Sequence, residues 1–367
     1  MEENKKSKIS RVLIVILIIL MMAFCGLYFG DKQVLHIIEK NEQLAFETEE
    51  ERINNLEISK NIYLCLNEKY YVNNIDRYDD SIIEFHNDND KNYIMGIKVG
   101  ETKVYDVDND QMYLVSVSNL YDLEQINPNK LPLPCHKYSQ DEAAYLDTVL
   151  QNKIYDAGYN TRAGVVAAMR FLTLQFKYKL LYFCENGRLD TNTGREMCDG
   201  EGRYYHVGLY LSEDKFNDIS VSKEGPAIWG CDLYEIPEAR DYYNGIDCSG
   251  LITWSLLNAG YDCGDIGGGY GIESEGFDCV DLGKAVEIKD IDYADIKAGD
   301  LIGYSGHIGM IIGIDGQKLY VAQAYWENDL EVVTYNNYDE LEKSKWEYVV
   351  LMDGYYKQDG NYTATWY

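Results

Sequence analysis

Basic residues are scarce in this chain. Its 367 residues include 33 Lys and Arg against 62 Asp and Glu, which gives a formal net charge of −29. Nucleic-acid phosphates select basic surfaces, so this balance argues against a nucleic-acid partner. It argues equally against loose adhesion to anionic wall polymers. Acidity of this kind is typical of a solvated, soluble extracellular domain.

Proline and histidine are also rare, with five of each. Three of the prolines, Pro128, Pro132 and Pro134, fall within residues 121–140, and we place a linker there. The sequence contains no CxxC pair and no His/Cys cluster with the spacing of zinc ligands. We therefore expect neither a metal nor another cofactor.

Charge is missing altogether from residues 12–30, an apolar stretch of 19 residues. A stretch of this length can span a hydrocarbon core of about 30 Å. Residues 1–11 carry four basic residues and predict a cytoplasmic tail, which places everything after Asp31 outside the membrane. The alternatives are a cleaved signal peptide and a lipid anchor at Cys25. A clean small-x-small cleavage site is missing, and bulky Phe24 disfavours lipidation.

Three further regions lead up to the C-terminal part of the chain. Residues 31–58 predict a charged helical stalk, and residues 59–120 contain short alternating runs that predict a small β-sandwich. Its turn at residues 99–104 resembles those of bacterial Ig-like repeats of the group 2 type. We expect a spacer domain with no ligand of its own, and binding of wall material is the alternative. Residues 141–219 predict a helical lobe, with helices over 141–150 and 161–174 and Thr161 as the N-cap of the second.

Cys248 lies where a helix is predicted to begin. The sequence Asp247-Cys248-Ser249-Gly250 precedes a helical apolar pattern that stops at Gly260. The amides and dipole of a helix N-terminus favour a thiolate at such a position. Since the thiolate is the reactive form of cysteine, Cys248 is a candidate nucleophile.

His307 is the only histidine after Cys248 and is the candidate base. It begins the second of two predicted strands within residues 298–316. The next predicted strand contains Gln323, a polar residue in an apolar run, which we expect to orient the imidazole. His206, in a similar His-Val-Gly sequence before Cys248, is the alternative base in a permuted site.

Several motifs together resemble the NlpC/P60 family of papain-like cysteine peptidases. They are Asp-Cys-Ser-Gly-Leu, Ala-Gly-Asp-Leu and His-Ile-Gly, in that order, preceded by Pro226-Ala-Ile-Trp-Gly-Cys231. The resemblance covers roughly residues 220–350. It implies an α+β fold with a papain-like core over residues 220–357, in which a Cys-bearing helix packs on an antiparallel sheet. It implies catalytic roles for Cys248, His307 and Gln323, and substrate contacts from Asp247, Ser249 and Trp229.

The resemblance also implies a function. Family members are typically cell-wall hydrolases that cut peptidoglycan stem peptides, often after γ-D-glutamate. The chain is thus expected to be a single-pass protein of the cell membrane, with an extracellular cysteine endopeptidase that acts through a thioester. At two positions the chain departs from the family motif: Ala227 replaces a substrate-site Tyr and Cys231 replaces Gly. A CHAP-like amidase and a non-catalytic wall-binding scaffold are the alternatives.

The cysteines allow two short-loop disulfides, Cys184 with Cys198 and Cys263 with Cys279. Reduced, buried thiols are the alternative for all of them.

Overall fold

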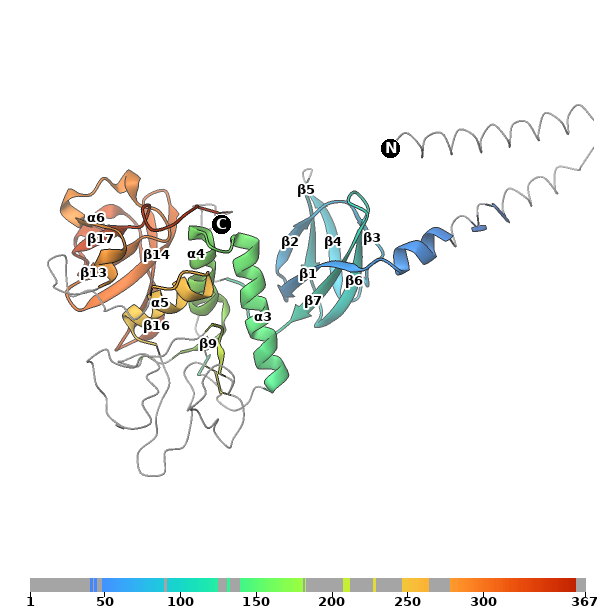
Figure 1. Cartoon of the computed structure of the whole chain (residues 1–367), viewed down its shortest axis with the longest axis horizontal. Coiled ribbons are helices and arrows are strands. Elements are labelled where there is room, and N and C mark those ends of the chain that lie inside the picture. The colour runs from blue at the N-terminus through green and yellow to red at the C-terminus, as the bar shows by residue number, and fades with distance from the viewer. Residues whose placement is uncertain are drawn as a thin grey trace, which may run out of the picture. The chain divides into compact units, whose positions relative to one another are not determined.

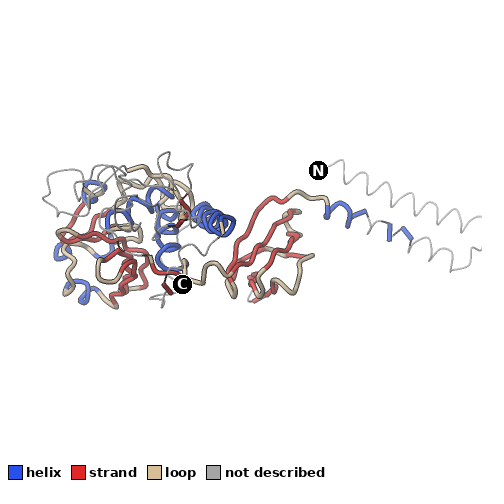
Figure 2. The backbone as a smooth tube through the Cα atoms, turned by 90° about the horizontal axis from the view of Figure 1, so that it is seen from below, coloured by secondary structure: helices blue, strands red, loops and turns tan. Residues whose placement is uncertain are grey.

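The computed structural model describes residues 40–41, 43–44, 48–88, 91–124, 131–132, 139–180, 182, 207–211, 227–228, 246–263 and 278–360. These residues form a mixed α+β structure with several antiparallel sheets (Figures 1 and 2). The chain divides into two compact units. One comprises residues 1–61, 73–78 and 103–114, and the other comprises residues 62–72, 79–102 and 115–367.

The predicted membrane helix over residues 12–30 lies outside the described residues. Among the helices that are described, none is both long enough and apolar enough to cross a bilayer. Residues 48–54, within the predicted stalk, are helical.

Seven short strands occupy the region where a β-sandwich is predicted. They form a four-stranded sheet in the order β1-β7-β6-β3 and a three-stranded sheet in the order β2-β5-β4. Strands β2 and β3 were not expected from the sequence. The bounds are β1 Ile58–Cys65, β2 Lys69–Val72, β3 Ile75–Asp76, β4 Ile83–Asp88, β5 Lys91–Gly96, β6 Gly100–Asp106 and β7 Gln111–Ser118.

Two helices follow where the sequence predicts them. Helix α3 (Gln140–Ala157) begins at a capping box between Ser139 and Glu142. Helix α4 (Arg162–Arg170) begins at Thr161, whose side chain accepts a hydrogen bond from the Gly164 N–H, so the predicted N-cap is confirmed. The α-helix is shorter than the predicted 161–174, because residues Phe171–Gln175 form a π-helix, η1.

The C-terminal region forms a six-stranded antiparallel sheet in the order β12-β17-β13-β14-β15-β16. Its strands are β12 Lys284–Glu287, β13 Leu301–Tyr304, β14 His307–Asp315, β15 Lys318–Tyr325, β16 Asp329–Tyr335 and β17 Tyr348–Leu351. The short elements around it are η3 Cys279–Leu282, η4 Ile288–Asp290, η5 Tyr293–Asp295 and α6 Tyr338–Glu342. Two further strand pairs are two residues long: β8 Leu131–Pro132 with β9 Tyr178–Lys179, and β10 Tyr210–Leu211 with β11 Ala227–Ile228.

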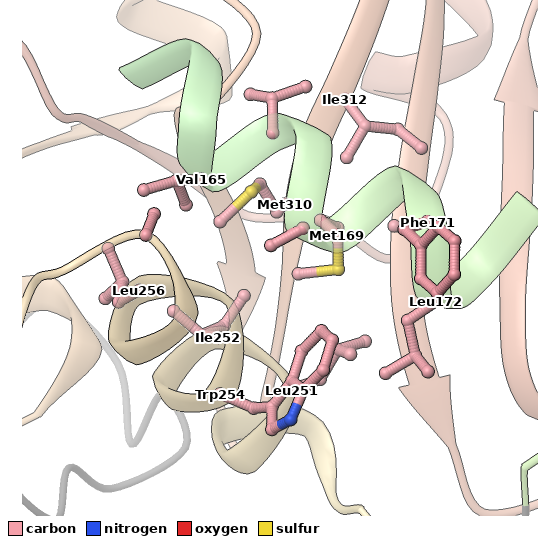
Figure 3. Close-up of a cluster of buried hydrophobic side chains, with 14 of the residues drawn as sticks. Val165, Met169, Phe171, Leu172, Leu251, Ile252, Trp254, Leu256, Met310 and Ile312 are labelled. Carbon is pink, nitrogen blue, oxygen red and sulfur yellow. The ribbon is translucent and has the colours of Figure 1, made fainter. Parts of the chain in front are cut away.

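Helix α5 (Cys248–Asn258) is the most deeply embedded helix of this region, with ten of its eleven residues buried. Its side chains Leu251 and Ile252 point toward Met169 of α4 and Met310 of β14 (Figure 3). Each such fully buried apolar side chain stabilises the fold by about 2 kcal/mol. The helix that carries Cys248 is therefore fixed by packing against both α4 and the sheet.

Candidate active site

Asp247 caps the helix that presents Cys248. Its Oδ1 accepts a hydrogen bond from the Gly250 N–H at 2.7 Å and another from the Ser249 hydroxyl at 3.2 Å. Gly260, at φ +92°, follows the other end of the helix, as the sequence predicts. The cap places Cys248 at the first helical position, with Ser249 engaged in the cap.

The protonation of Cys248 differs from the sequence-based expectation of a thiolate. Only 7% of the residue is exposed, and burial raises the pKa of its thiol to about 12, with the Asp247 carboxylate adding to the effect. The backbone N–H groups of Ile308, Ser249 and Cys248 act in the opposite direction. A helix dipole contributes about 0.3–1 kcal/mol, less than one pKa unit, whereas burial moves a pKa by up to about 3–5. The effect of burial on the Cys248 pKa is therefore larger than that of the helix dipole, and the side chain is a neutral thiol.

His307 is held by the amide of Gln323 on the neighbouring strand β15, and that amide is held in turn by the carboxylate of Glu331 on β16. Its Nε2 lies 2.8 Å from Gln323 Oε1, and Gln323 Nε2 donates to Glu331 Oε1 at 2.7 Å. Gln323 and Glu331 are direct cross-strand partners on β15 and β16. A carboxylate only accepts hydrogen bonds, so Glu331 fixes the amide with its oxygen toward the ring. The neutral imidazole then carries its proton on Nε2 and leaves Nδ1 to act as a base.

Three aromatic rings surround the imidazole. Trp346 stacks on it at 5.5 Å and 23°, Tyr304 lies 5.2 Å away, and Tyr325 meets it edge-on at 5.3 Å. His307 is only 5% exposed, and burial lowers its pKa below 6.5. The hydrogen bond with Gln323 raises this pKa and the nearby Lys345 lowers it further. Near neutral pH the ring is therefore uncharged and available as a base.

The structure brings Cys248 to the start of the strand that carries His307. The N–H of Ile308, the residue after His307, lies close enough to the Cys248 sulfur to lower its pKa. Tyr304, which pairs with His307 across the β13–β14 turn, also interacts with Cys248, since the thiol contributes to raising the Tyr304 pKa to about 12. Among the hydrogen bonds of the described residues, none joins the Cys248 sulfur directly to the imidazole.

Several of the sequence-based assignments fall elsewhere. Trp229, His206 and the Cys184–Cys198 pair lie outside the described residues. The Cys263–Cys279 disulfide that the spacing allows is not formed, because Cys279 is a buried free thiol, in keeping with the alternative of reduced thiols. Within the described ranges, no three His, Cys, Asp or Glu side chains are placed to hold a metal ion.

Sequence reasoning missed Glu331 and the aromatic rings around His307. No local signal marks Glu331 as part of the site, because only the β15–β16 register places it opposite Gln323. The chain has no match among protein-family models, curated proteins or solved structures.

Proposed function

We propose that this chain is a cysteine peptidase in which Cys248 is the nucleophile and His307 the base. The observation that carries the proposal is the hydrogen-bonded series Glu331–Gln323–His307 beside the start of the helix that presents Cys248. A nucleophile, a base and a group that orients the base are the three parts of such a site. Burial on all sides fixes each part in position.

The mechanism starts from a neutral thiol and a neutral imidazole, in place of the thiolate expected from the sequence. As the Cys248 sulfur attacks an amide carbonyl, Nδ1 of His307 takes the thiol proton and then delivers it to the leaving amine. The products of this half-reaction are a thioester on Cys248 and a free amine. A water molecule, deprotonated by the same nitrogen, then attacks the thioester carbonyl. The C–S bond breaks, the carboxylic acid product leaves, and His307 returns the proton to the Cys248 sulfur. The N–H groups at the start of α5 stabilise the oxyanion.

The proposed substrate is the stem peptide of peptidoglycan, cut after γ-D-glutamate. This choice depends on the resemblance of the motifs around Cys248 and His307 to those of the NlpC/P60 family. A Cys-bearing helix packed on an antiparallel sheet supports the papain-like assignment. An anchor over residues 12–30 would hold the enzyme at the cell membrane with its site facing the wall.

Digestion of defined muropeptides tests this function. The purified protein is incubated with them beside Cys248→Ala and His307→Ala, and the products are analysed by mass spectrometry. Cys65→Ala is a matched control, because Cys65 is also a buried free thiol but belongs to β1. We expect new fragments from the wild type and from Cys65→Ala only. Equal cleavage by His307→Ala would reject His307 as the base, and absence of cleavage by every form would reject the peptidase.

A further inference from the structure

Among the residues that the structure describes, the buried hydroxyl of Tyr348 finds no hydrogen-bond partner. Tyr348 begins β17 and is 1% exposed. An unsatisfied buried hydroxyl costs about 1–3 kcal/mol, and such groups are rare in folded proteins. In the described part of the chain, the hydroxyls of four other residues share this property (Tyr121, Tyr145, Thr253 and Thr334), so the position of Tyr348 must decide whether it has a role.

The tyrosine ring lies across the neighbouring strand, over Gly303. Gly303 of β13 pairs with Tyr348 on one side and with Ile308 on the other. A Cβ atom at Gly303 would come within 2.5 Å of the Tyr348 Oη and 2.6 Å of its Cζ. Only glycine therefore leaves room for the ring, whose hydroxyl reaches over β13 in the direction of β14.

That direction leads toward the candidate nucleophile. On β14, the Ile308 N–H faces the Cys248 sulfur, and Tyr348 and Cys248 belong to the same buried cluster. Burial raises the pKa of Tyr348 well above its usual range, and Asp278, Cys279, Glu347 and, to a smaller extent, Cys248 contribute in the same direction. The hydroxyl consequently remains protonated and can donate a hydrogen bond.

We propose that the Tyr348 hydroxyl donates a hydrogen bond to the carbonyl oxygen of the substrate as Cys248 attacks it. This role rests on the proposed function, since it requires an acyl transfer at Cys248. The substrate oxygen, negatively charged in the tetrahedral intermediate, supplies the missing acceptor. A donor that is already oriented and dehydrated needs no reorganisation during the reaction, and the loss of one such donor typically lowers kcat by about 10²–10³-fold. Tyr348 and the α5 amides would then form a two-sided oxyanion site.

Tyr348→Phe removes the hydroxyl and keeps the ring over Gly303. We expect kcat on muropeptides to fall by about 10²-fold with little change in KM. The melting temperature should stay the same or rise, because the variant no longer buries an unpaired hydroxyl. A second readout uses two probes of Cys248. Alkylation by iodoacetamide forms no oxyanion and should proceed at the wild-type rate, whereas a peptide aldehyde that mimics the scissile bond should bind about 10²-fold more weakly.

Tyr121→Phe is the control, because Tyr121 is another fully buried tyrosine but packs on Phe171. It should leave both kcat and aldehyde affinity unchanged. Wild-type kcat and aldehyde affinity in Tyr348→Phe would overturn the role of Tyr348 and leave the peptidase intact. A wild-type protein that neither cleaves muropeptides nor binds the aldehyde would overturn the peptidase and this role together.

Discussion

At the scale of single residues, burial keeps both Cys248 and His307 neutral. It raises the pKa of the thiol to about 12 and lowers the pKa of the imidazole below 6.5. An ion pair between a Cys248 thiolate and a His307 imidazolium would need a lowered pKa for the thiol and a raised pKa for the imidazole. The account therefore requires His307 to remove the thiol proton during attack, and the pH dependence of the reaction should show this.

The predicted pH profile of kcat/KM has one acidic limb and no early alkaline limb. Activity needs uncharged His307, so it should rise with pH through the His307 pKa, below 6.5, and then stay level through pH 9 because the thiol remains protonated. Steady-state kinetics from pH 4 to 10 measure this profile. A bell-shaped profile with its acidic limb near the pKa of a cysteine thiolate would instead support a preformed ion pair.

Gln323 should act on catalysis through His307. In Gln323→Ala the imidazole loses its hydrogen-bond acceptor, so we expect kcat to fall by about 10²-fold. Because this hydrogen bond raises the His307 pKa, its removal should also move the acidic limb of the profile to lower pH. Asn328→Ala, which removes the weaker 3.3 Å contact to Glu331, is the control. An unchanged acidic limb in Gln323→Ala would contradict the positioning role.

At the scale of secondary-structure elements, a helix cap and an ion network stabilise the Cys-bearing helix and its surroundings. The Asp247 cap defines where α5 begins. An ion network connects α4 to the sheet. The buried Arg162 guanidinium donates to buried Asp300 at 2.8 Å and to exposed Asp353 at 2.5 Å, and lies over the Tyr356 ring. Asp300, the acid of the Gly-Asp-Leu motif, also accepts the Met352 N–H. Its position in the network gives this motif a structural role.

Arg162→Met should destabilise the protein by about 3–5 kcal/mol, because Asp300 would remain buried without its cation. Urea unfolding followed by circular dichroism measures the change. Lys289→Met, which removes a solvent-exposed ion pair with Glu287, is the control and should leave the free energy of unfolding nearly unchanged. Equal effects of the two substitutions would show that the Arg162 network contributes no more than a surface pair.

Asp247→Asn distinguishes two effects of Asp247, its capping of α5 and the effect of its negative charge on Cys248. Asparagine keeps a cap acceptor, so stability should change little, whereas Asp247→Ala should cost about 0.5–2 kcal/mol. Loss of the carboxylate should lower the Cys248 pKa and speed its alkylation at neutral pH, on the order of a few-fold. Alkylation rates followed by mass spectrometry measure this. A slower reaction in Asp247→Asn would contradict the electrostatic effect assigned to Asp247.

At the scale of the whole molecule, local signals predicted much of the site. The helix starting at Cys248, the strand starting at His307 and the hydrogen bond from His307 to Gln323 all follow from short patterns. Glu331, Trp346 and Tyr348 could not be foreseen, because their places depend on which strands pair and in what register. The neutral thiol was missed for a related reason: burial of Cys248 arises from tertiary packing, which outweighs the local helix dipole.

The most direct test of the account is to look for the thioester itself. The protein is mixed with a muropeptide, quenched with acid within the first turnovers and analysed by intact mass spectrometry, with peptide mapping to locate any adduct. The account predicts an added acyl mass on Cys248, absent from Cys248→Ala. Cleavage that proceeds equally well in Cys248→Ala, with no adduct in the wild type, would contradict it.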